Sequence, residues 1–393
     1  MCVTSPTGYD PPAHGGNLRW AAQRYGRPVT GLIDFSASIN PLGPPPAVRR
    51  ALRRALSEVE HYPDPDALRF REKLAQRLGV PLASTRALNG GAEGFFWLLH
   101  HWRPRRVIVP VPAFSEYARA AAAVGAELRA PALLRPSLSG DACRAALPVD
   151  ALLDEAMAGA VVVIANPNNP TGHAYERGRL LELHRRLRTV GARLLVDEAF
   201  LDFLPDADRR TLAREAAHAD DLVVVGSLTK FFALPGLRLG YLIAEPHLLK
   251  ELDRLRHSWP VNHLAQVAGA EALGDERTYT RFAQRTRQLI AGERAWLLTA
   301  LSGIPGVRVY ASAANFLLLE LAPDWPGAGP VVDQLGRRGL LVRDASNFVG
   351  LGPGALRIAV RRRRENRRLV RELARLATDF GVAQSPFAGV IGS

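Results

Sequence analysis

Short apolar runs rich in β-branched residues alternate with amphipathic stretches along the chain to about residue 255. This alternation is typical of βαβ units and predicts an α/β domain with a mainly parallel sheet. The expected strands are Arg106–Val109, Val161–Ala165, Arg193–Val196, Leu222–Gly226 and Arg238–Ile243. The expected helices are Asp66–Leu78, Ala92–His101, Ser115–Val124 and Glu176–Val190.

After about residue 256 the pattern changes to that of a smaller α+β unit. A long helical pattern covers Asp275–Leu301, and a basic helical pattern, Glu365–Asp379, closes the fold. The strand-like runs between them are Val307–Tyr310, Asn315–Leu321, Leu340–Val342 and Leu356–Val360.

The N-terminal stretch has a different character, because prolines at Pro41 and 44–46 interrupt it. We expect it to run over the surface as an arm, as proline-rich connecting segments do. The chain is therefore predicted to have three parts: an arm over residues 1–45 that contributes to the substrate site and the small domain, a large domain over 46–255 and a small domain over 256–393.

Composition narrows the class of protein. Hydrophobic residues make up 47% and charged residues 23% of the 393 positions, which is ordinary for a globular chain and excludes a mainly disordered, collagen-like or coiled-coil protein. The net charge of +13 favours a polyanionic partner, but only Lys73, Lys230 and Lys250 of the 51 basic residues are lysines. This bias indicates a general preference for arginine, and we expect no nucleic-acid partner.

One arginine cluster has two interpretations. The run Arg361–Arg364, with further arginines on the helix that follows, could bind phosphate as a basic stripe. Glu365 and Glu372 interrupt it, and alternating charges of this kind are typical of a solvated helix face.

The cysteine content and the absence of long apolar runs indicate in which compartment of the cell we expect the protein. Cys2 and Cys143 cannot form a disulfide framework, and no His/Cys cluster has zinc spacing, so we expect no metal and a reducing, cytoplasmic setting. Residues 1–16 have no apolar core, and no apolar run approaches the ~18 residues that span a bilayer. We therefore expect no membrane partner.

The strongest chemical motif is Gly226-Ser227-Leu228-Thr229-Lys230, at the end of a predicted strand and eight residues before Arg238. Ligands of α/β sheets bind at the carboxyl ends of the strands. Two hydroxyls and an arginine suit a phosphate, and a lysine amine beside a phosphate suggests a Schiff base to pyridoxal phosphate. The alternative is a surface lysine next to a turn.

Asp197 ends a second predicted strand, in Val196-Asp197-Glu198-Ala199-Phe200. A buried aspartate can keep the pyridine nitrogen of pyridoxal phosphate protonated, which the electron-sink chemistry of the cofactor requires. Taken alone, an aspartate at a strand end could equally cap a helix. Together with Lys230 it is a candidate pyridinium partner.

Two loops add further candidate ligands. Asn166-Pro167-Asn168-Asn169-Pro170-Thr171-Gly172 follows the strand Val161–Ala165, and its prolines and glycine fix a turn from which the Asn169 amide could donate to the phenolate oxygen of the cofactor. Asn89-Gly90-Gly91-Ala92-Glu93 begins a predicted helix, where free N–H groups bind phosphate. Either segment alone would be an ordinary turn.

In this order, these four segments resemble the fold-type I pyridoxal-phosphate enzymes of the aspartate aminotransferase superfamily. The resemblance implies a three-layer α/β/α large domain and pyridoxal 5'-phosphate as cofactor. It makes Lys230 the Schiff-base lysine, Asp197 the pyridinium partner and Asn169 the contact to the phenolate oxygen. The phosphate would be held by Ser227, Thr229, Arg238 and the backbone of Gly91, Ala92 and Glu93.

Aromatic positions extend the resemblance. Tyr62 is similar to the tyrosine that reaches the phosphate of the neighbouring subunit, which implies a homodimer with shared active sites. Phe114 occupies the region whose aromatic ring stacks on the pyridine, with Tyr117 as the rival candidate. Phe200 departs from the superfamily, which usually has tyrosine three residues after the aspartate, and the missing hydroxyl leaves Asn169 as the chief donor to the phenolate oxygen.

The N-terminal motifs His14-Gly15-Gly16-Asn17 and Asp34–Gly43 resemble the L-threonine-O-3-phosphate decarboxylases of cobalamin biosynthesis. That resemblance assigns Arg343 and Arg357 to the phosphate and carboxylate of the substrate, and adds His14, the Gly15 amide and Asn169 to the substrate site. Arginine binds both kinds of anion bidentately. Arg357 could instead anchor only an amino-acid carboxylate, as across the superfamily.

Ser38 departs from this family, which usually has asparagine at that position to contact the substrate. A serine keeps a hydrogen bond but has a shorter reach.

The activity that the resemblance implies is decarboxylation of L-threonine O-3-phosphate to (R)-1-amino-2-propanol O-2-phosphate, with Lys230 returning a proton to Cα. The alternative with the same fold is a histidinol-phosphate aminotransferase or another class I/II aminotransferase, since histidinol-phosphate aminotransferase uses similar residues to break the Cα–H bond. A nucleic-acid-binding or regulatory protein built on this fold is the alternative from another class, and the intact lysine site argues against it.

Overall fold

The large domain is organised around a seven-stranded sheet with the order β2-β8-β7-β6-β5-β3-β4. The structure is a computed structural model that describes residues 14–133 and 147–383. The strands of this sheet are β2 (Thr85–Leu88), β3 (Arg106–Ile108), β4 (Glu127–Arg129), β5 (Val161–Ala165), β6 (Arg193–Asp197), β7 (Leu222–Ser227) and β8 (Gly240–Ile243). Only β8 runs antiparallel to its neighbours, so the predicted mainly parallel sheet is confirmed.

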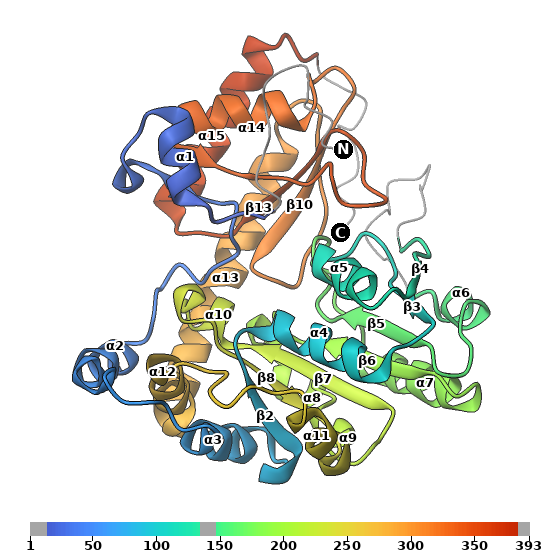
Figure 1. The fold of residues 1–393 in the computed structure, drawn as a ribbon. Coiled ribbons are helices and arrows are strands. Elements are labelled where there is room, and N and C mark those ends of the chain that lie inside the picture. The colour runs from blue at the N-terminus through green and yellow to red at the C-terminus, as the bar shows by residue number, and fades with distance from the viewer. Residues whose placement is uncertain (1–13, 134–146, 384–393) are drawn as a thin grey trace.

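Helices cover both faces of this sheet, as Figure 1 shows. Alternate residues of β5 point to opposite faces, as strand geometry requires: Val161 and Val163 pack in one apolar core, Val162 and Ile164 in the other. The first core includes α4 (Gly91–Trp102) and α5 (Ser115–Ala123), and the second includes α3 (Leu68–Leu78) and α7 (Arg177–Thr189). The three-layer α/β/α architecture is therefore confirmed.

The strand expected to begin at Arg238 begins instead at Gly240. Residues Pro235–Leu237 form a 3-10 turn, and Arg238 has a left-handed backbone with φ 56°, which no β-strand accommodates. β2 and β4 were not predicted. β2 is buried but has the sequence Thr-Arg-Ala-Leu, and the three residues of β4 are exposed, so neither shows the apolar run of a central strand.

The small domain contains a four-stranded antiparallel sheet of order β12-β13-β10-β9. Its strands are β9 (Val307–Val309), β10 (Phe316–Leu321), β12 (Arg343–Asp344) and β13 (Ala355–Ala359), and its helices are α13 (Glu276–Ser302), α14 (Ala328–Arg337) and α15 (Arg363–Asp379). The predicted long helix, the strands and the terminal helix all occur, with bounds that shift by a few residues.

The N-terminal segment runs along the small domain, with residues 14–31 exposed or half-buried except for Ala21 and residues 35–40 largely buried. Helix α1 (Leu18–Tyr25) packs against α14, and β1 (Ile33–Asp34) pairs in parallel with β11 (Leu340–Leu341). Phe35, directly after β1, is completely buried. The described part of the predicted arm therefore lies mainly at the surface up to residue 31 and contacts the small domain through α1 and β1.

The division at residue 255 also differs from the structure in one element. Helix α12 (His263–Gly274) lies after that position but packs against α2 (Pro46–Ala55) and α3 of the large domain.

Cys2 and Cys143 lie outside the described residues. Among the helices that the structure describes, none is long and apolar enough to cross a membrane.

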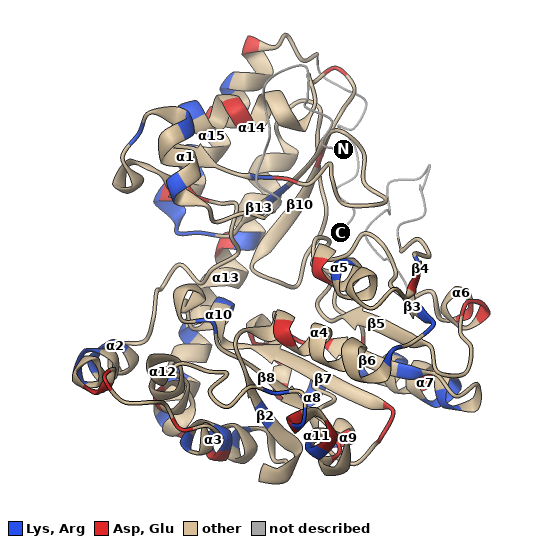
Figure 2. Cartoon of the chain, viewed as in Figure 1, with Lys and Arg blue, Asp and Glu red and all other residues tan. Residues whose placement is uncertain are grey.

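The arginine-rich helix α15 has acidic partners. Glu365 accepts from Arg361 at 2.8 Å, and Glu372 accepts from Arg375 at 3.2 Å. Basic and acidic positions are interspersed over both domains in Figure 2. These contacts favour the interpretation of a solvated, charge-paired face.

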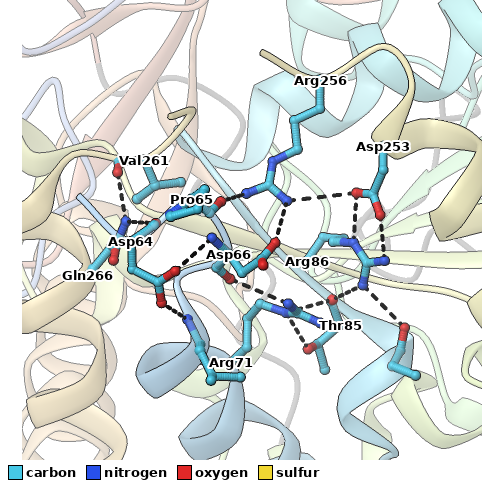
Figure 3. Close-up of polar contacts among 12 residues, drawn as sticks. Asp64, Pro65, Asp66, Arg71, Thr85, Arg86, Asp253, Arg256, Val261 and Gln266 are labelled. Carbon is cyan, nitrogen blue, oxygen red and sulfur yellow. Dashed lines mark hydrogen bonds and ion pairs between the residues drawn. The ribbon is translucent and has the colours of Figure 1, made fainter. Parts of the chain in front are cut away.

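A buried polar network anchors the segment 64–71 to the large domain (Figure 3). Arg71 donates to the Thr85 carbonyl at 3.0 Å, and Arg86 binds both carboxylate oxygens of Asp253, at 2.9 and 2.7 Å. Arg256 contacts the Pro65 carbonyl and lies near Asp253. The network joins the start of α3 to β2 and to the end of α11 (Pro246–Asp253).

Replacement of Asp253 by alanine should therefore destabilise the fold. Arg86 is 8% exposed and would lose two charge-assisted hydrogen bonds, so the free energy of unfolding should fall by about 2 kcal/mol in urea denaturation. Glu182→Ala is the control, because it removes an exposed i,i+3 pair with Arg179 that should contribute less than about 0.5 kcal/mol. Equal losses in the two variants would contradict this role of the network.

Candidate functional site

A cavity of about 400 Å³ lies at the carboxyl edge of the large sheet and is lined by both domains. It brings together residues that are far apart in the sequence. The predicted site residues that line it are His14, Gly15, Ser38, Gly91, Ala92, Phe114, Asn169, Asp197, Ser227, Thr229, Lys230, Arg238, Arg343 and Arg357. Glu93 and Tyr62 do not line it.

Lys230 lies in the short helix α10 (Leu228–Phe231), directly after β7. Ser227 caps this turn, because its hydroxyl accepts from the Thr229 N–H at 3.3 Å and lies 2.8 Å from the Thr229 hydroxyl. Burial, together with the positive charges of Arg357 and Arg238, lowers the pKa of Lys230 to about 8. Its amine can therefore act as a nucleophile near neutral pH.

Asn40 supports the lysine turn and was not predicted as a site residue. Its backbone N–H donates to the Lys230 carbonyl at 3.1 Å, and its side chain donates to the Phe231 carbonyl at 2.8 Å. Asn40 is 2% exposed, so these bonds are shielded from water. The only signal in the sequence was an asparagine before a proline, which predicts a turn but no partner.

Asp197 is buried at the end of β6 and accepts two hydrogen bonds. The Tyr117 hydroxyl donates to Oδ2 at 2.6 Å, and the Ala199 N–H donates to Oδ1 at 2.9 Å. Burial raises the pKa of Asp197, whereas these two bonds and the charge of Lys230 lower it. The arrangement suits a carboxylate that pairs with a protonated pyridine nitrogen.

The structure separates the two aromatic candidates for ring stacking. Tyr117 is 1% exposed, is edge-on to Phe95 and Phe114, and uses its hydroxyl on Asp197. Both rings line the cavity, but Phe114 is half-buried and therefore the more accessible of the two. These positions favour Phe114 as the stacking ring and give Tyr117 the role of holding the aspartate.

The candidate phosphate ligands lie close together because of two glycines, Gly90 and Gly240. A side chain on Gly90 would collide with the Arg238 guanidinium, and a Cβ on Gly240 would lie 2.5 Å from the Gly91 nitrogen. The glycines thus let Arg238 and the start of β8 reach the N-terminus of α4, where free N–H groups bind anions. Glu93 differs from its predicted position, since its N–H donates to the Gly90 carbonyl and its carboxylate accepts from the Asn89 N–H.

Two buried arginines from the small domain complete the cavity. Arg343 and Arg357 are paired in register on the neighbouring strands β12 and β13. Arg357 donates to Asn169 Oδ1 at 2.6 Å and to the Ser36 carbonyl at 2.9 Å. Burial and the charge of Arg343 lower the pKa of Arg357 to about 9, because two cations close together in an apolar setting disfavour one another.

Phe200 and Ser38, the two positions at which the sequence departs from the families that it resembles, both line the cavity. Phe200 lines the cavity and packs edge-on against Phe316 at 5.0 Å, so it contributes an apolar ring where a hydroxyl is usual. The Ser38 hydroxyl is buried and has no hydrogen-bond partner among the described residues. An unpaired buried hydroxyl is costly, and a polar ligand in the cavity would satisfy it.

Tyr62 lies on another part of the surface. It is 79% exposed and stacks on Trp259, with ring centroids 4.2 Å apart. Its role at the phosphate of a neighbouring subunit stays a prediction.

The donor set fits pyridoxal phosphate. The cavity presents a lysine amine of lowered pKa, a buried carboxylate and a half-buried aromatic ring. Hydroxyls, an arginine and a helix N-terminus surround the point where a phosphate would lie. Fold and site together define a pyridoxal-phosphate-dependent enzyme.

Comparison with known proteins identifies the family. The chain matches the family Aminotransferase class I and II over residues 30–373 and belongs to it. The threonine-phosphate decarboxylase of Salmonella typhimurium is 36% identical over 94% of this chain and 98% of its own. A histidinol-phosphate aminotransferase of Methanocella arvoryzae is 30% identical over 92% of this chain and 94% of its own.

A solved structure shows the same fold. The histidinol-phosphate aminotransferase of Sinorhizobium meliloti, in complex with pyridoxal-5'-phosphate, superposes with a TM-score of 0.80 and 20% identity over 93% of this chain and 96% of that one. Pyridoxal phosphate is the cofactor of this family. When bound, it supplies an electron sink for a bond broken at the α-carbon of an amino acid.

Substitution of Tyr117 by phenylalanine should weaken cofactor binding. The change removes a 2.6 Å hydrogen bond to Asp197, which leaves burial to raise the pKa of that carboxylate further. The dissociation constant of pyridoxal phosphate, measured by absorbance titration, should rise about tenfold, as for loss of one hydrogen bond to a charged group. Tyr175→Phe is the matched control, because the structure gives its buried hydroxyl no partner among the described residues. Similar affinities in the two variants would refute the role of Tyr117.

The lowered pKa of Lys230 predicts the pH dependence of cofactor capture. Only the neutral amine attacks the aldehyde of pyridoxal phosphate, so capture by the cofactor-free protein should accelerate as the pH rises, with a midpoint near the pKa of about 8. Stopped-flow absorbance would measure the rate. Lys250→Ala should leave the midpoint unchanged. A midpoint near 10.5, the ordinary value for lysine, would contradict the prediction.

Proposed function

We propose that the protein decarboxylates L-threonine O-3-phosphate to (R)-1-amino-2-propanol O-2-phosphate and CO₂, a step that supplies the aminopropanol linker of cobalamin. The observation that supports this most directly is the pair of buried arginines, Arg343 and Arg357, in the cavity that contains Lys230. Such a pair matches a small substrate with two anionic groups, since each guanidinium can bind a phosphate or a carboxylate bidentately.

The chain's own residues would do three things to this substrate. Arg343, Arg357 and His14 would hold its two anionic groups and fix the orientation of the Cα–carboxylate bond. The cavity wall around Phe200 would limit the access of water. The Lys230 amine, with its pKa of about 8, could give a proton to Cα after CO₂ has left.

Because some of its relatives are histidinol-phosphate aminotransferases, that activity is the second candidate function. Histidinol phosphate has one phosphate and no carboxylate, but the 2-oxoglutarate that accepts its amino group has two carboxylates, so the arginine pair would serve an aminotransferase as well. An aminotransferase also needs a keto acid to accept the amino group, whereas a decarboxylase does not. This difference separates the two activities in one assay.

The purified holoenzyme should release CO₂ from O-phospho-L-threonine in many turnovers with no keto acid present. Lys230→Ala should lose this activity, because no other lysine lines the cavity. Trapped CO₂ and the amine product would both be measured. Turnover restricted to histidinol phosphate plus 2-oxoglutarate would overturn the proposal in favour of the aminotransferase.

A further inference from the structure

Asn40 joins three parts of the molecule. Its backbone N–H donates to the Lys230 carbonyl at 3.1 Å, and its Nδ2 donates to the Phe231 carbonyl at 2.8 Å. Nδ2 also donates at 2.9 Å to the hydroxyl of Thr286, which lies on α13 and is completely buried. One residue therefore connects the N-terminal segment, the lysine turn α10 and the long helix of the small domain.

The orientation of the Asn40 amide follows from its partners. A carbonyl can only accept a hydrogen bond, so Nδ2 must face Phe231. The Leu42 N–H can only donate, so Oδ1 must face Leu42, at 3.0 Å. Nδ2 thus makes two bonds and Oδ1 one, and the side chain is shielded from water. An aspartate has the same shape but no donor, so this position requires the amide.

The turn that carries Lys230 needs support at its carboxyl end. Helix α10 has only four residues, and the last carbonyls of a helix have no partner within it. Ala233, two residues later, has a left-handed backbone with φ 54°, which is strained for a residue with a Cβ and persists only where the surroundings fix it. Ser227 holds the other end of the turn through the Thr229 N–H. With Asn40 in place, the backbone of Lys230 is held on both sides.

We propose that Asn40 is a positioning residue that anchors the lysine turn to Thr286 of α13 and so holds the Lys230 amine in the orientation for attack on the cofactor aldehyde. An amine attacks an aldehyde along a restricted direction, so a looser turn would make fewer encounters productive. The orientation of a large-domain residue then depends on a helix of the small domain. The inference goes beyond the proposed function, because it concerns capture of the cofactor and holds whichever substrate the enzyme takes.

Asn40→Ala tests the proposal in the cofactor-free full-length chain. Stopped-flow absorbance would give both the amplitude and the rate constant of pyridoxal phosphate capture. The rate constant at the high-pH plateau, where the amine is neutral, should fall about tenfold with the amplitude unchanged. A purely structural role would instead reduce the amplitude, because part of the protein would be unfolded, and would leave the rate constant of the folded part unchanged.

The pH profile of capture distinguishes orientation from charge. Asn40 is uncharged, so its replacement by alanine should leave the midpoint near the Lys230 pKa of about 8. Burial lowers that pKa, and the charged groups that also act on it stay in place: Arg357, Arg238, Asp34 and Asp197. A shifted midpoint with an unchanged plateau would overturn the proposal, since Asn40 would then act on the charge of the amine.

Two further variants separate the donors of Asn40 from the volume it fills and from stability. Asn40→Asp keeps the shape but has no donors, so its rate constant should also fall about tenfold. Asn366→Ala is the matched control, because Asn366 is completely buried and donates to the Arg361 carbonyl at 2.7 Å and to Glu293 of α13 at 2.9 Å, but does not line the cavity. It should lower the free energy of unfolding without changing the rate constant. Equal decreases in rate constant in Asn40→Ala and Asn366→Ala would refute the positioning role.

The anchor on α13 has its own test. Thr286→Val removes the hydroxyl and should lower the rate constant about threefold, whereas Thr286→Ser keeps the hydroxyl and should capture at the unmodified rate. In the double variant Asn40→Ala/Thr286→Val the rate constant should equal that of Asn40→Ala, because Thr286 acts through Asn40. Independent, multiplicative effects would overturn the anchor. If Asn40→Ala does not fold, equal rate constants in Thr286→Val and Thr286→Ser would overturn the proposal.

These measurements are separate from the proposed activity, because no substrate is present during capture. Absence of CO₂ release from O-phospho-L-threonine in the unmodified enzyme would refute the decarboxylase and leave the Asn40 comparison intact. An unchanged rate constant of capture in Asn40→Ala would refute the positioning role and leave the decarboxylase untouched.

Discussion

The site depends on an imbalance of charge in a partly closed cavity. Lys230, Arg119, Arg238, Arg343 and Arg357 line this cavity, whereas its buried carboxylates are Asp197 and Glu116. Burial disfavours the charged forms, and the cations repel one another, so the pKa of Lys230 falls to about 8 and that of Arg357 to about 9. Anionic groups on the cofactor and on the substrate would relieve this repulsion. The same imbalance therefore favours anionic ligands and gives the lysine a neutral amine near physiological pH.

Two domains must cooperate to create this arrangement. The large sheet places Asp197 and Lys230 at the carboxyl ends of neighbouring strands, where ligands of α/β sheets bind. The small sheet supplies Arg343 and Arg357 from paired positions on β12 and β13. The bond between Arg357 and Asn169 joins the two sets across the cavity. If Arg357 binds the substrate, as proposed, substrate recognition is coupled to the loop after β5 that would contact the cofactor.

Local pattern was sufficient to predict the parts of the fold that are buried and continuous. Strands β5, β6 and β7 contain buried apolar runs, so the positions of Asp197 and Lys230 at or just after their ends could be predicted, while the roles of both residues were implied by the resemblance. The pattern was insufficient where a contact joins distant residues. The bonds from Tyr117 to Asp197 and from His14 to Glu116 span 80 and 102 positions, and neither partner has a local feature that points to the other. The pairing of the N-terminal β1 with β11 is a further contact between distant residues that no local pattern predicts.

The choice between decarboxylation and transamination depends on which bond at Cα stands perpendicular to the cofactor ring. Arg343 and Arg357 determine that choice if they bind the two anionic ends of the substrate, because a ligand held at two points cannot rotate freely between them. Their spacing is set by the pairing of β12 with β13 rather than by a loop. Phe200, packed on Phe316, adds an apolar wall, and Ser38 leaves a buried hydroxyl to be paired. The selectivity of the reaction is then a property of the small-domain sheet, which turns the substrate, while Lys230 and Asp197 supply chemistry that either reaction could use.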